Sequence, residues 1–188
     1  MAGNAVHKGL VIASVAYLVI VGVFVFSERG VVPSPVVPEI SREGIWLRIP
    51  SIGVNASMQS VGLTPKGNMG IPTNYTDVAW FTGSAKPGTA GTSIVVGHRD
   101  THIFGPGVFR SLGQLAAGDD VYVTIDGKEA HFRVVGKRTY KEDTDRIEEI
   151  TRGDGHTARL NLITCEGTWN QSVRRYDERL VVFTELVR

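Results

Sequence analysis

The sequence predicts a mostly β protein that folds as a closed or nearly closed β-barrel with a few short helices. From residue 44 onward, short stretches of alternating or β-branched apolar residues recur along the chain, and Gly, Pro, Asn and Asp separate them. The pair Asp126-Gly127 stands between two such stretches, which is a strong signal for a tight hairpin. Many short strands with turn residues between them are typical of a barrel.

Each expected element follows from its local pattern of residues. Val, Ile and Thr favour strands, and alternation of apolar with polar residues is typical of a strand with one buried face. Two short helices are expected, around Val108–Leu115 and around Thr144–Ile150. The expected strands are Ile45–Ile49, which stops at Pro50, and Ser93–Val96, Val121–Ile125, Ala130–Val135, Arg159–Thr164 and Leu180–Leu186.

An uncharged apolar run of 17 residues extends from Leu10 to Phe26. This length is at the short end of the range for a helix that spans a membrane. The run ends without the small-x-small site of a cleaved signal peptide, so an uncleaved anchor is the favoured interpretation and a cleaved signal peptide is the alternative. Lys8 precedes the run, and a basic residue at this place slightly favours a cytoplasmic N-terminus.

These features divide the chain into four parts. Residues 1–9 are expected in the cytoplasm, and residues 10–26 are expected to form a transmembrane helix. Residues 27–43 contain three prolines, which indicates an extended extracytoplasmic linker. Residues 44–188 are expected to form one domain outside the cytoplasm, on a protein that crosses the cell membrane once.

Composition excludes several classes of function. Lys and Arg total 20 against 19 Asp and Glu, a net charge of +1, so there is no electrostatic reason to expect a nucleic-acid partner. A single cysteine excludes an intramolecular disulfide and a CxxC metal or redox site. His98 and His102 are four residues apart but follow a strand-like stretch, so no metal site is expected there. Any thiol chemistry therefore belongs to Cys165.

Cys165 is the candidate nucleophile. It follows the expected strand Arg159–Thr164, where a rigid sheet would fix it beside an open loop. A free cysteine is more often a small buried hydrophobic residue, and the local pattern alone leaves that alternative open. An unpaired thiol in an exported domain, with polar neighbours such as Thr164 and Glu166, favours the nucleophile.

Two further residues complete a candidate site around this cysteine. A cysteine nucleophile needs a base or a cation that favours the thiolate, and acyl transfer needs donors for the oxyanion. His98 directly follows the apolar stretch Ile94–Gly97 and is the leading candidate for the base. Arg179 directly precedes the last expected strand, which would place it beside Cys165 if the two strands pair. Arg175 lies in the intervening segment, which is expected to be a loop.

The combination of these residues resembles the sortase family. The tetrapeptide Leu162–Cys165 matches the last four positions of the sortase TLxTC signature, and Asn161 stands in place of its leading threonine. Gly97-His98 resembles the upstream GH element, and Arg179 followed by Leu-Val-Val resembles the arginine that begins the last sortase strand. The order His, Cys, Arg is the same, and the resemblance covers about residues 44–188.

The resemblance implies an eight-stranded β-barrel and a transpeptidase that cleaves an LPxTG-like sorting motif of surface proteins. In that chemistry Cys165 attacks the threonine carbonyl and forms a thioacyl-enzyme, which an amine of a cell-wall peptide or of another protein resolves. His98 would act as general acid and base, and Arg179 would stabilise the oxyanion. Thr164 and the backbone N–H of Glu166 would contact the substrate.

No cofactor is implied for this chemistry. Several sortases use acidic loop residues to bind calcium, but the acidic cluster of this chain is interpreted as a solvated turn and helix start. The stretch His98–His102 resembles class D sortases and Gly105–Phe109 resembles classes E and F, so the subclass stays open. The acidic cluster consists of Glu142, Asp143, Asp145, Glu148 and Glu149.

Other classes of function compete with this interpretation. An L,D-transpeptidase would carry an SHGC-like sequence at its cysteine, and NlpC-type hydrolases place the cysteine before the histidine; this chain has neither pattern. A non-catalytic, anchored β-barrel that binds a surface partner would keep the fold and tolerate the loss of His98, Cys165 or Arg179. All three residues are present, which favours the enzyme.

Overall fold

The computed structural model describes residues 44–101, 105–143, 146–151 and 153–188. The expected membrane anchor at residues 10–26 and the linker that follows it lie outside these residues. In the described part of the chain, no helix is both long and apolar enough to cross a membrane.

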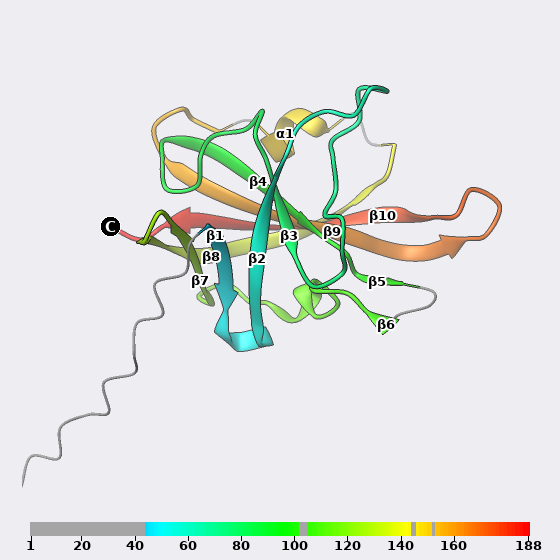
Figure 1. The fold of residues 1–188 in the computed structure, drawn as a ribbon, viewed down its shortest axis with the longest axis horizontal. Coiled ribbons are helices and arrows are strands. Elements are labelled where there is room, and N and C mark those ends of the chain that lie inside the picture. The colour runs from blue at the N-terminus through cyan, green and yellow to red at the C-terminus, as the bar shows by residue number, and fades with distance from the viewer. Residues whose placement is uncertain (1–43, 102–104, 144–145, 152) are drawn as a thin grey trace, which may run out of the picture. The chain divides into compact units, whose positions relative to one another are not determined.

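Eight strands form a closed barrel in which each strand pairs with two neighbours (Figure 1). Around the barrel the order is β1-β2-β3-β4-β9-β10-β8-β7, and β7 pairs with β1 to close it. The pairs β2–β3 and β4–β9 are parallel, and the others are antiparallel. The barrel strands are β1 (Ile45–Ile49), β2 (Val54–Val61), β3 (Val78–Phe81), β4 (Gly91–Gly97), β7 (Asp120–Ile125), β8 (Lys128–Lys141), β9 (Ala158–Asn170) and β10 (Arg175–Leu186).

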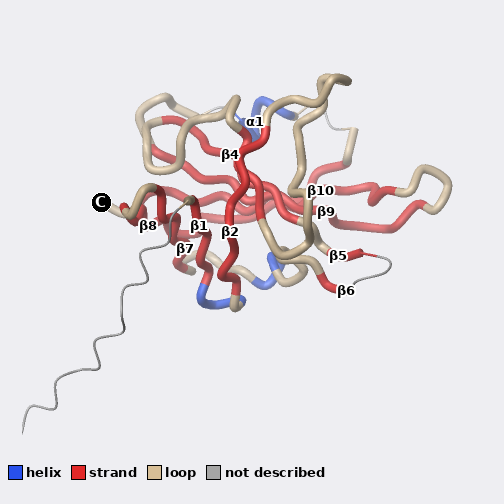
Figure 2. The backbone as a smooth tube through the Cα atoms, in the orientation of Figure 1, coloured by secondary structure: helices blue, strands red, loops and turns tan. Residues whose placement is uncertain are grey.

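Short elements connect the barrel strands (Figure 2). The two-residue strands β5 (Asp100–Thr101) and β6 (Gly105–Pro106) pair with each other in antiparallel orientation. Helix α1 (Ile147–Thr151) lies in the connection from β8 to β9, and 3-10 turns occur at Pro50–Ile52 and Leu112–Gln114. The expected mostly β barrel with few short helices is thus confirmed for the described residues.

The hairpin between β7 and β8 forms at the expected residues. Asp126 and Gly127 both have positive φ angles, of 51° and 74°. Two such residues in succession are what a type I′ turn requires, and this turn matches the twist of the flanking strands. The other expected strands also occur, but β2 and β3 were not expected. β2 does alternate, with Val54, Ala56 and Met58 buried, but its Asn and Ala are poor strand formers, and β3 is only the four residues Val-Ala-Trp-Phe.

The helix expected around Val108–Leu115 is wrong in extent, because only a 3-10 turn forms there. Phe109, Leu112 and Leu115 are all fully buried in the main core. Side chains three residues apart lie above one another in a 3-10 turn, so this tighter turn directs all three into the core. The second expected helix corresponds to the five-residue α1.

Side chains that alternate along the strands fill the barrel. On β9, Leu160 and Leu162 belong to the main core, whereas Ile163 packs with the smaller apolar clusters outside it. On β10, Leu180 and Val182 belong to the main core. Burial of each such side chain stabilises the fold by about 1.5–3 kcal/mol. The alternation also fixes which residues of β9 and β10 face outward.

β9 and β10 extend beyond the barrel as one long hairpin (Figure 1). The expected strand boundaries at Thr164 and Leu180 are therefore wrong, because β9 continues to Asn170 and β10 begins at Arg175. The added residues are mostly polar and lack apolar alternation, so backbone pairing rather than core burial holds this extension. The register shifts between Tyr176 and Glu178, where Gly167 and Thr168 of β9 lie opposite the single residue Asp177 of β10, which produces a bulge in β9.

Candidate active site

Cys165 and Arg179 lie opposite each other on the paired strands β9 and β10. Leu162 and Thr164 are buried and alternate with Cys165, so Cys165 belongs to the outer face of the strand. Residues directly opposite in an antiparallel pair have Cβ atoms about 4.5–5.5 Å apart. The structure therefore places Arg179 beside the thiol.

His98 follows the end of β4, the parallel neighbour of β9 on its other side. Val96 and Ile163 are register partners, and His98 and Cys165 each lie two residues further along. The Thr164 hydroxyl donates a hydrogen bond of 2.8 Å to the carbonyl of Gly97, which keeps the two chains together at this point. His98, Cys165 and Arg179 thus lie at one level of three adjacent chain segments.

The His98 ring is held by the segment between β2 and β3. Its Nε2 lies 3.1 Å from the carbonyl oxygen of Pro72, and its centroid lies 5.0 Å from that of Tyr75. A carbonyl oxygen only accepts, so Nε2 carries the hydrogen in this contact. The backbone of His98 accepts a hydrogen bond of 2.9 Å from the N–H of Phe109. Nδ1 is therefore the ring nitrogen that carries no hydrogen in the neutral ring.

We expect Gly97→Ala to lower the stability of the domain. A Cβ on Gly97 would lie 2.5 Å from Cδ2 of Phe109, whose ring is fully buried. Overpacking of this kind costs about 1–3 kcal/mol. Urea unfolding measures the change, and Gly136→Ala is the matched control, since a Cβ on that strand residue meets nothing within 4 Å. Equal stability of the two variants would contradict the close packing beneath His98.

The Arg179 guanidinium is fixed by three acceptors. Its Nη1 donates to the carbonyl oxygens of Tyr176 at 3.0 Å and Glu178 at 2.8 Å. Its Nη2 donates to Oε1 of Glu142 at 2.8 Å. The guanidinium thus lies against the β10 backbone opposite the bulge of β9, and the Glu142 carboxylate is its third partner.

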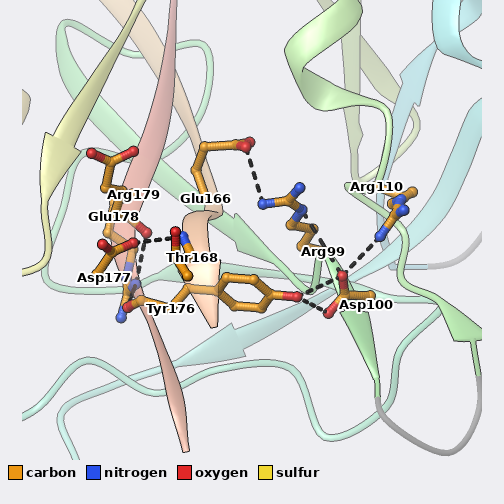
Figure 3. A network of polar contacts seen from close by, with 9 residues as sticks. All are labelled: Arg99, Asp100, Arg110, Glu166, Thr168, Tyr176, Asp177, Glu178 and Arg179. Atoms are coloured by element: carbon orange, nitrogen blue, oxygen red, sulfur yellow. Dashed lines mark hydrogen bonds and ion pairs between the residues drawn. The ribbon is translucent and has the colours of Figure 1, made fainter. Parts of the chain in front are cut away.

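A second polar network joins the start of β5 to the long hairpin (Figure 3). The Asp100 carboxylate accepts hydrogen bonds of 2.8 Å from the Tyr176 hydroxyl and from Arg110. The Arg99 guanidinium carbon lies 5.1 Å from the centroid of the Tyr176 ring, and Nη1 lies 3.0 Å from the Glu166 carboxylate. This network ties the segment that follows His98 to β9 and β10.

Thr164 and Glu166, the two expected substrate contacts, differ in how far they are buried. Thr164 is buried, with 4% of its surface exposed, and its hydroxyl is engaged by Gly97. Glu166 is half-buried directly after the cysteine, and its side chain forms an ion pair with Arg99. Thr164 therefore links two chain segments beneath the site, whereas Glu166 lies at the site's edge.

Burial raises the pKa of the Cys165 thiol above its ordinary value. Arg179 acts in the opposite direction, because its positive charge favours the thiolate. The carboxylates of Asp100 and Glu142 raise the pKa, and Arg99 lowers it. Burial thus outweighs the two cations, and the resting thiol is neutral at neutral pH.

This balance predicts the pH dependence of thiol modification. Only the thiolate reacts with iodoacetamide, so a raised pKa moves the midpoint of the pH–rate profile upward. We expect the midpoint for folded Cys165 to lie above that of the same cysteine in the chain unfolded by urea. Arg179→Ala should raise it further, because a cation beside the thiolate is lost. Mass spectrometry of the alkylated peptide measures both, and a folded midpoint at or below the unfolded one would contradict the assignment.

Several charged and aromatic residues of the site were not singled out as site residues from the sequence. Asp100, Tyr176 and Arg99 come together only because β5 folds against the β9–β10 hairpin. Glu142 was interpreted as part of a solvated acidic turn, but it pairs with Arg179 and Arg175. In the described residues, no group of three or more His, Cys, Asp or Glu side chains is arranged to hold a metal ion.

Comparison with known proteins assigns the family. The model of the sortase domain matches residues 47–187. Sortase A from Corynebacterium diphtheriae (a lid mutant) is 20% identical with a TM-score of 0.60, and the match covers 78% of this chain and 71% of that one. Sortase C-1 from Actinomyces oris is 23% identical with a TM-score of 0.59, covering 77% and 73%. A Clostridium perfringens sortase D5 transpeptidase is 19% identical with a TM-score of 0.59, covering 78% and 79%. A search of curated proteins gave no match.

The closed mostly β barrel and the three solved structures define the sortase fold. The family match covers most of the chain, and the chain belongs to the sortase family. Its class of activity is that of a cysteine transpeptidase.

Proposed function

We propose that this protein is a membrane-anchored sortase that cleaves an LPxTG-like sorting motif of surface proteins and transfers the acyl group to an amine. The observation that carries the proposal is the row of His98, Cys165 and Arg179 at one level of adjacent segments, in a chain of the sortase family. Each residue supplies one function that amide transfer requires: a nucleophile, a proton carrier and an oxyanion donor.

In the first half-reaction, the Cys165 sulfur attacks the threonine carbonyl while the thiol proton passes to Nδ1 of His98. The scissile C–N bond then breaks, and His98 returns the proton to the leaving amine. A thioester between threonine and Cys165 remains. The neutral resting thiol fits this sequence, because the proton that the leaving amine needs enters with the nucleophile.

In the second half-reaction, an amine attacks the thioester and loses its proton to His98. The C–S bond breaks, a new amide forms, and the proton from His98 restores the Cys165 thiol. The amine must be bound and oriented to compete with water. Without an amine the same groups carry out slow hydrolysis.

Arg179 stabilises the oxyanion in both steps. A guanidinium has five N–H donors, and the hydrogen bonds to Tyr176, Glu178 and Glu142 engage three of them. Donors therefore remain for an oxyanion at Cys165. We assign the backbone N–H of Glu166 as a second donor, and we assign Thr164 the role of holding the chain below His98 in place.

An apolar row lies next to the three residues, and Ile163 is its partly exposed member, whereas Val96 and Val181 are buried. Val96, Ile163 and Val181 are register partners on three adjacent strands. Val96 and Ile163 precede His98 and Cys165 by two residues. Val181 follows Arg179 by two residues, because β10 is antiparallel to β9. Two residues of strand correspond to about 6.6 Å. A peptide with its threonine carbonyl at Cys165 would bring an upstream apolar side chain to Ile163, as a leucine-proline sequence requires.

A cavity of about 340 Å³ continues this surface toward the start of β4. Its wall includes the hydroxyl oxygen of Thr92, which is buried and has no hydrogen-bond partner among the described residues. Such a group is suited to a peptide N–H or C=O. The cavity is lined by Phe81, Gly83, Ser84, Ala85, Gly91, Thr92, Ile94, Thr151, Gly153 and Gly155.

The anchor and the partners belong to the same proposal. The apolar run at residues 10–26 supports a single-pass anchor in the cell membrane, with the catalytic domain outside the cytoplasm. The partners are surface proteins that carry the sorting motif, together with an amine of the cell wall or of another protein. The proposed chemistry needs no cofactor, and nucleic acid is not a partner.

A panel of quenched LPxTG-type peptides, with and without added oligoglycine or lysine-type amines, tests the function. We expect cleavage by the purified protein, and a new peptide–amine conjugate when the amine is present. If no peptide of a broad panel is cleaved and none becomes attached to the protein, the alternative of a non-catalytic barrel that binds a surface partner is favoured instead.

A further inference from the structure

Glu142 directly follows β8 and contacts two arginines of β10. Its Oε1 accepts hydrogen bonds from Nη2 of Arg179 at 2.8 Å and from Nη1 of Arg175 at 3.2 Å. The side chains of Glu142 and Arg179 are 29% and 28% exposed, so this ion pair is better protected from solvent than most surface pairs.

The backbone holds Glu142 in this place. Its N–H donates a hydrogen bond of 2.9 Å to the carbonyl of Asp177, which lies on β10 opposite the bulge of β9. The carbonyls that accept from Arg179 belong to Tyr176 and Glu178, the residues on either side of Asp177. The β10 backbone at Tyr176–Glu178 thus positions both the carboxylate and two of the acceptors around one guanidinium.

The other acid near the thiol is engaged elsewhere. Asp100 accepts from Arg110 and Tyr176, and it lies on the opposite side of β9, in the segment that follows β4. Among the described residues, Glu142 is the carboxylate that forms an ion pair with Arg179.

We propose that Glu142 is a positioning residue for Arg179, whose carboxylate holds the guanidinium beside Cys165 in the orientation that oxyanion stabilisation needs. The inference rests on the proposed function for its kinetic consequence. An arginine side chain has several rotatable bonds, and without the carboxylate only the two backbone carbonyls restrain it. Misplacement of a catalytic group by about 1 Å costs on the order of 10²-fold in rate.

Steady-state kinetics of the full chain with a cleaved LPxTG-type peptide test the proposal. We expect Glu142→Ala to lower kcat by roughly 10- to 100-fold with little change in KM, because Arg179 acts on the transition state. Glu142→Gln keeps an acceptor oxygen and should lose less. Glu185→Ala is the matched control: Glu185 lies on β10 and pairs with Arg159 at 3.1 Å, far along the strand from Cys165. We expect its kcat to stay near that of the wild type.

The midpoint of the pH–alkylation profile of Cys165 supplies a second readout. A general loss of stability would not lower this midpoint. The charged groups that act on the thiol are Arg179 on β10, Glu142 after β8, and Arg99 and Asp100 after β4, with His98 alongside. Glu142→Gln removes a negative charge, so the midpoint of the pH–alkylation profile should fall. Glu185→Gln should leave it unchanged.

The outcomes separate this inference from the proposed function. A Glu142→Ala kcat equal to or above that of Glu185→Ala, in folded variants with matching melting curves, would overturn the inference. An alkylation midpoint for Glu142→Gln equal to that of the wild type would do the same. If the wild type cleaves no peptide, the proposed function fails by itself, and the alkylation shift still decides whether the Glu142 carboxylate acts at the thiol.

Discussion

We expect Cys165→Ala to abolish both peptide cleavage and transfer to an amine. The thiol is the atom that bonds to the acyl group, and loss of a nucleophile from a catalytic unit costs on the order of 10⁶-fold in kcat. Stopped-time assays of the quenched peptide measure the loss, with the limit set by background hydrolysis. The substitution is small and the site is on the outer face of β9, so the barrel should remain folded.

Two controls make this result specific to Cys165. Circular dichroism and thermal unfolding should show the variant folded, because Cys165 lies outside the main core. Retention of more than a few per cent of the wild-type rate by Cys165→Ala would contradict a covalent role for the thiol.

The second large effect is expected for His98 and Arg179, which lie on the chain segments that flank Cys165 in the sheet. His98→Ala and Arg179→Ala should each lower kcat/KM by about 10²-fold or more, as loss of an acid–base or oxyanion group does. The two variants should differ in pH dependence, since His98→Ala removes a group that exchanges protons, whereas Arg179→Ala removes a fixed charge. Initial rates across a pH series measure both.

Arg175→Ala is the control for the arginine. Arg175 shares the Glu142 carboxylate with Arg179 but lies opposite Asn170, away from Cys165. We therefore expect a mild effect. If Arg175→Ala is crippling and Arg179→Ala is mild, the assignment of the oxyanion donor is wrong.

Parts of the fold follow from local sequence alone. The hairpin at Asp126-Gly127 was predictable because two residues with positive φ must occupy its turn. β2 and the polar extension of β9 beyond Cys165 were not, because Asn and Ala weaken the strand pattern of β2, and backbone pairing with the start of β10 rather than apolar alternation holds the extension. The turn at Leu112 was expected as a helix, since apolar residues three apart fit both a helix and a 3-10 turn.

Some residues of the candidate site could likewise be predicted from local sequence, and others could not. Cys165 and His98 could be singled out because each directly follows a strand-like stretch and has a distinctive residue type. The role of Glu142 depends on the bulge of β9 opposite Asp177, and the sequence around Glu142 does not indicate that register shift. Charged residues that act through another residue therefore became visible only once the strands were paired.

Intact-protein mass spectrometry of residues 44–188, which contain all eight barrel strands, tests the central claim most directly. After brief incubation with an LPxTG-type peptide, the account predicts an added mass equal to the acyl fragment, located at Cys165 and removed by an added amine. An adduct on another residue, or rapid cleavage of the peptide with no adduct under quench conditions that preserve thioesters, would contradict it.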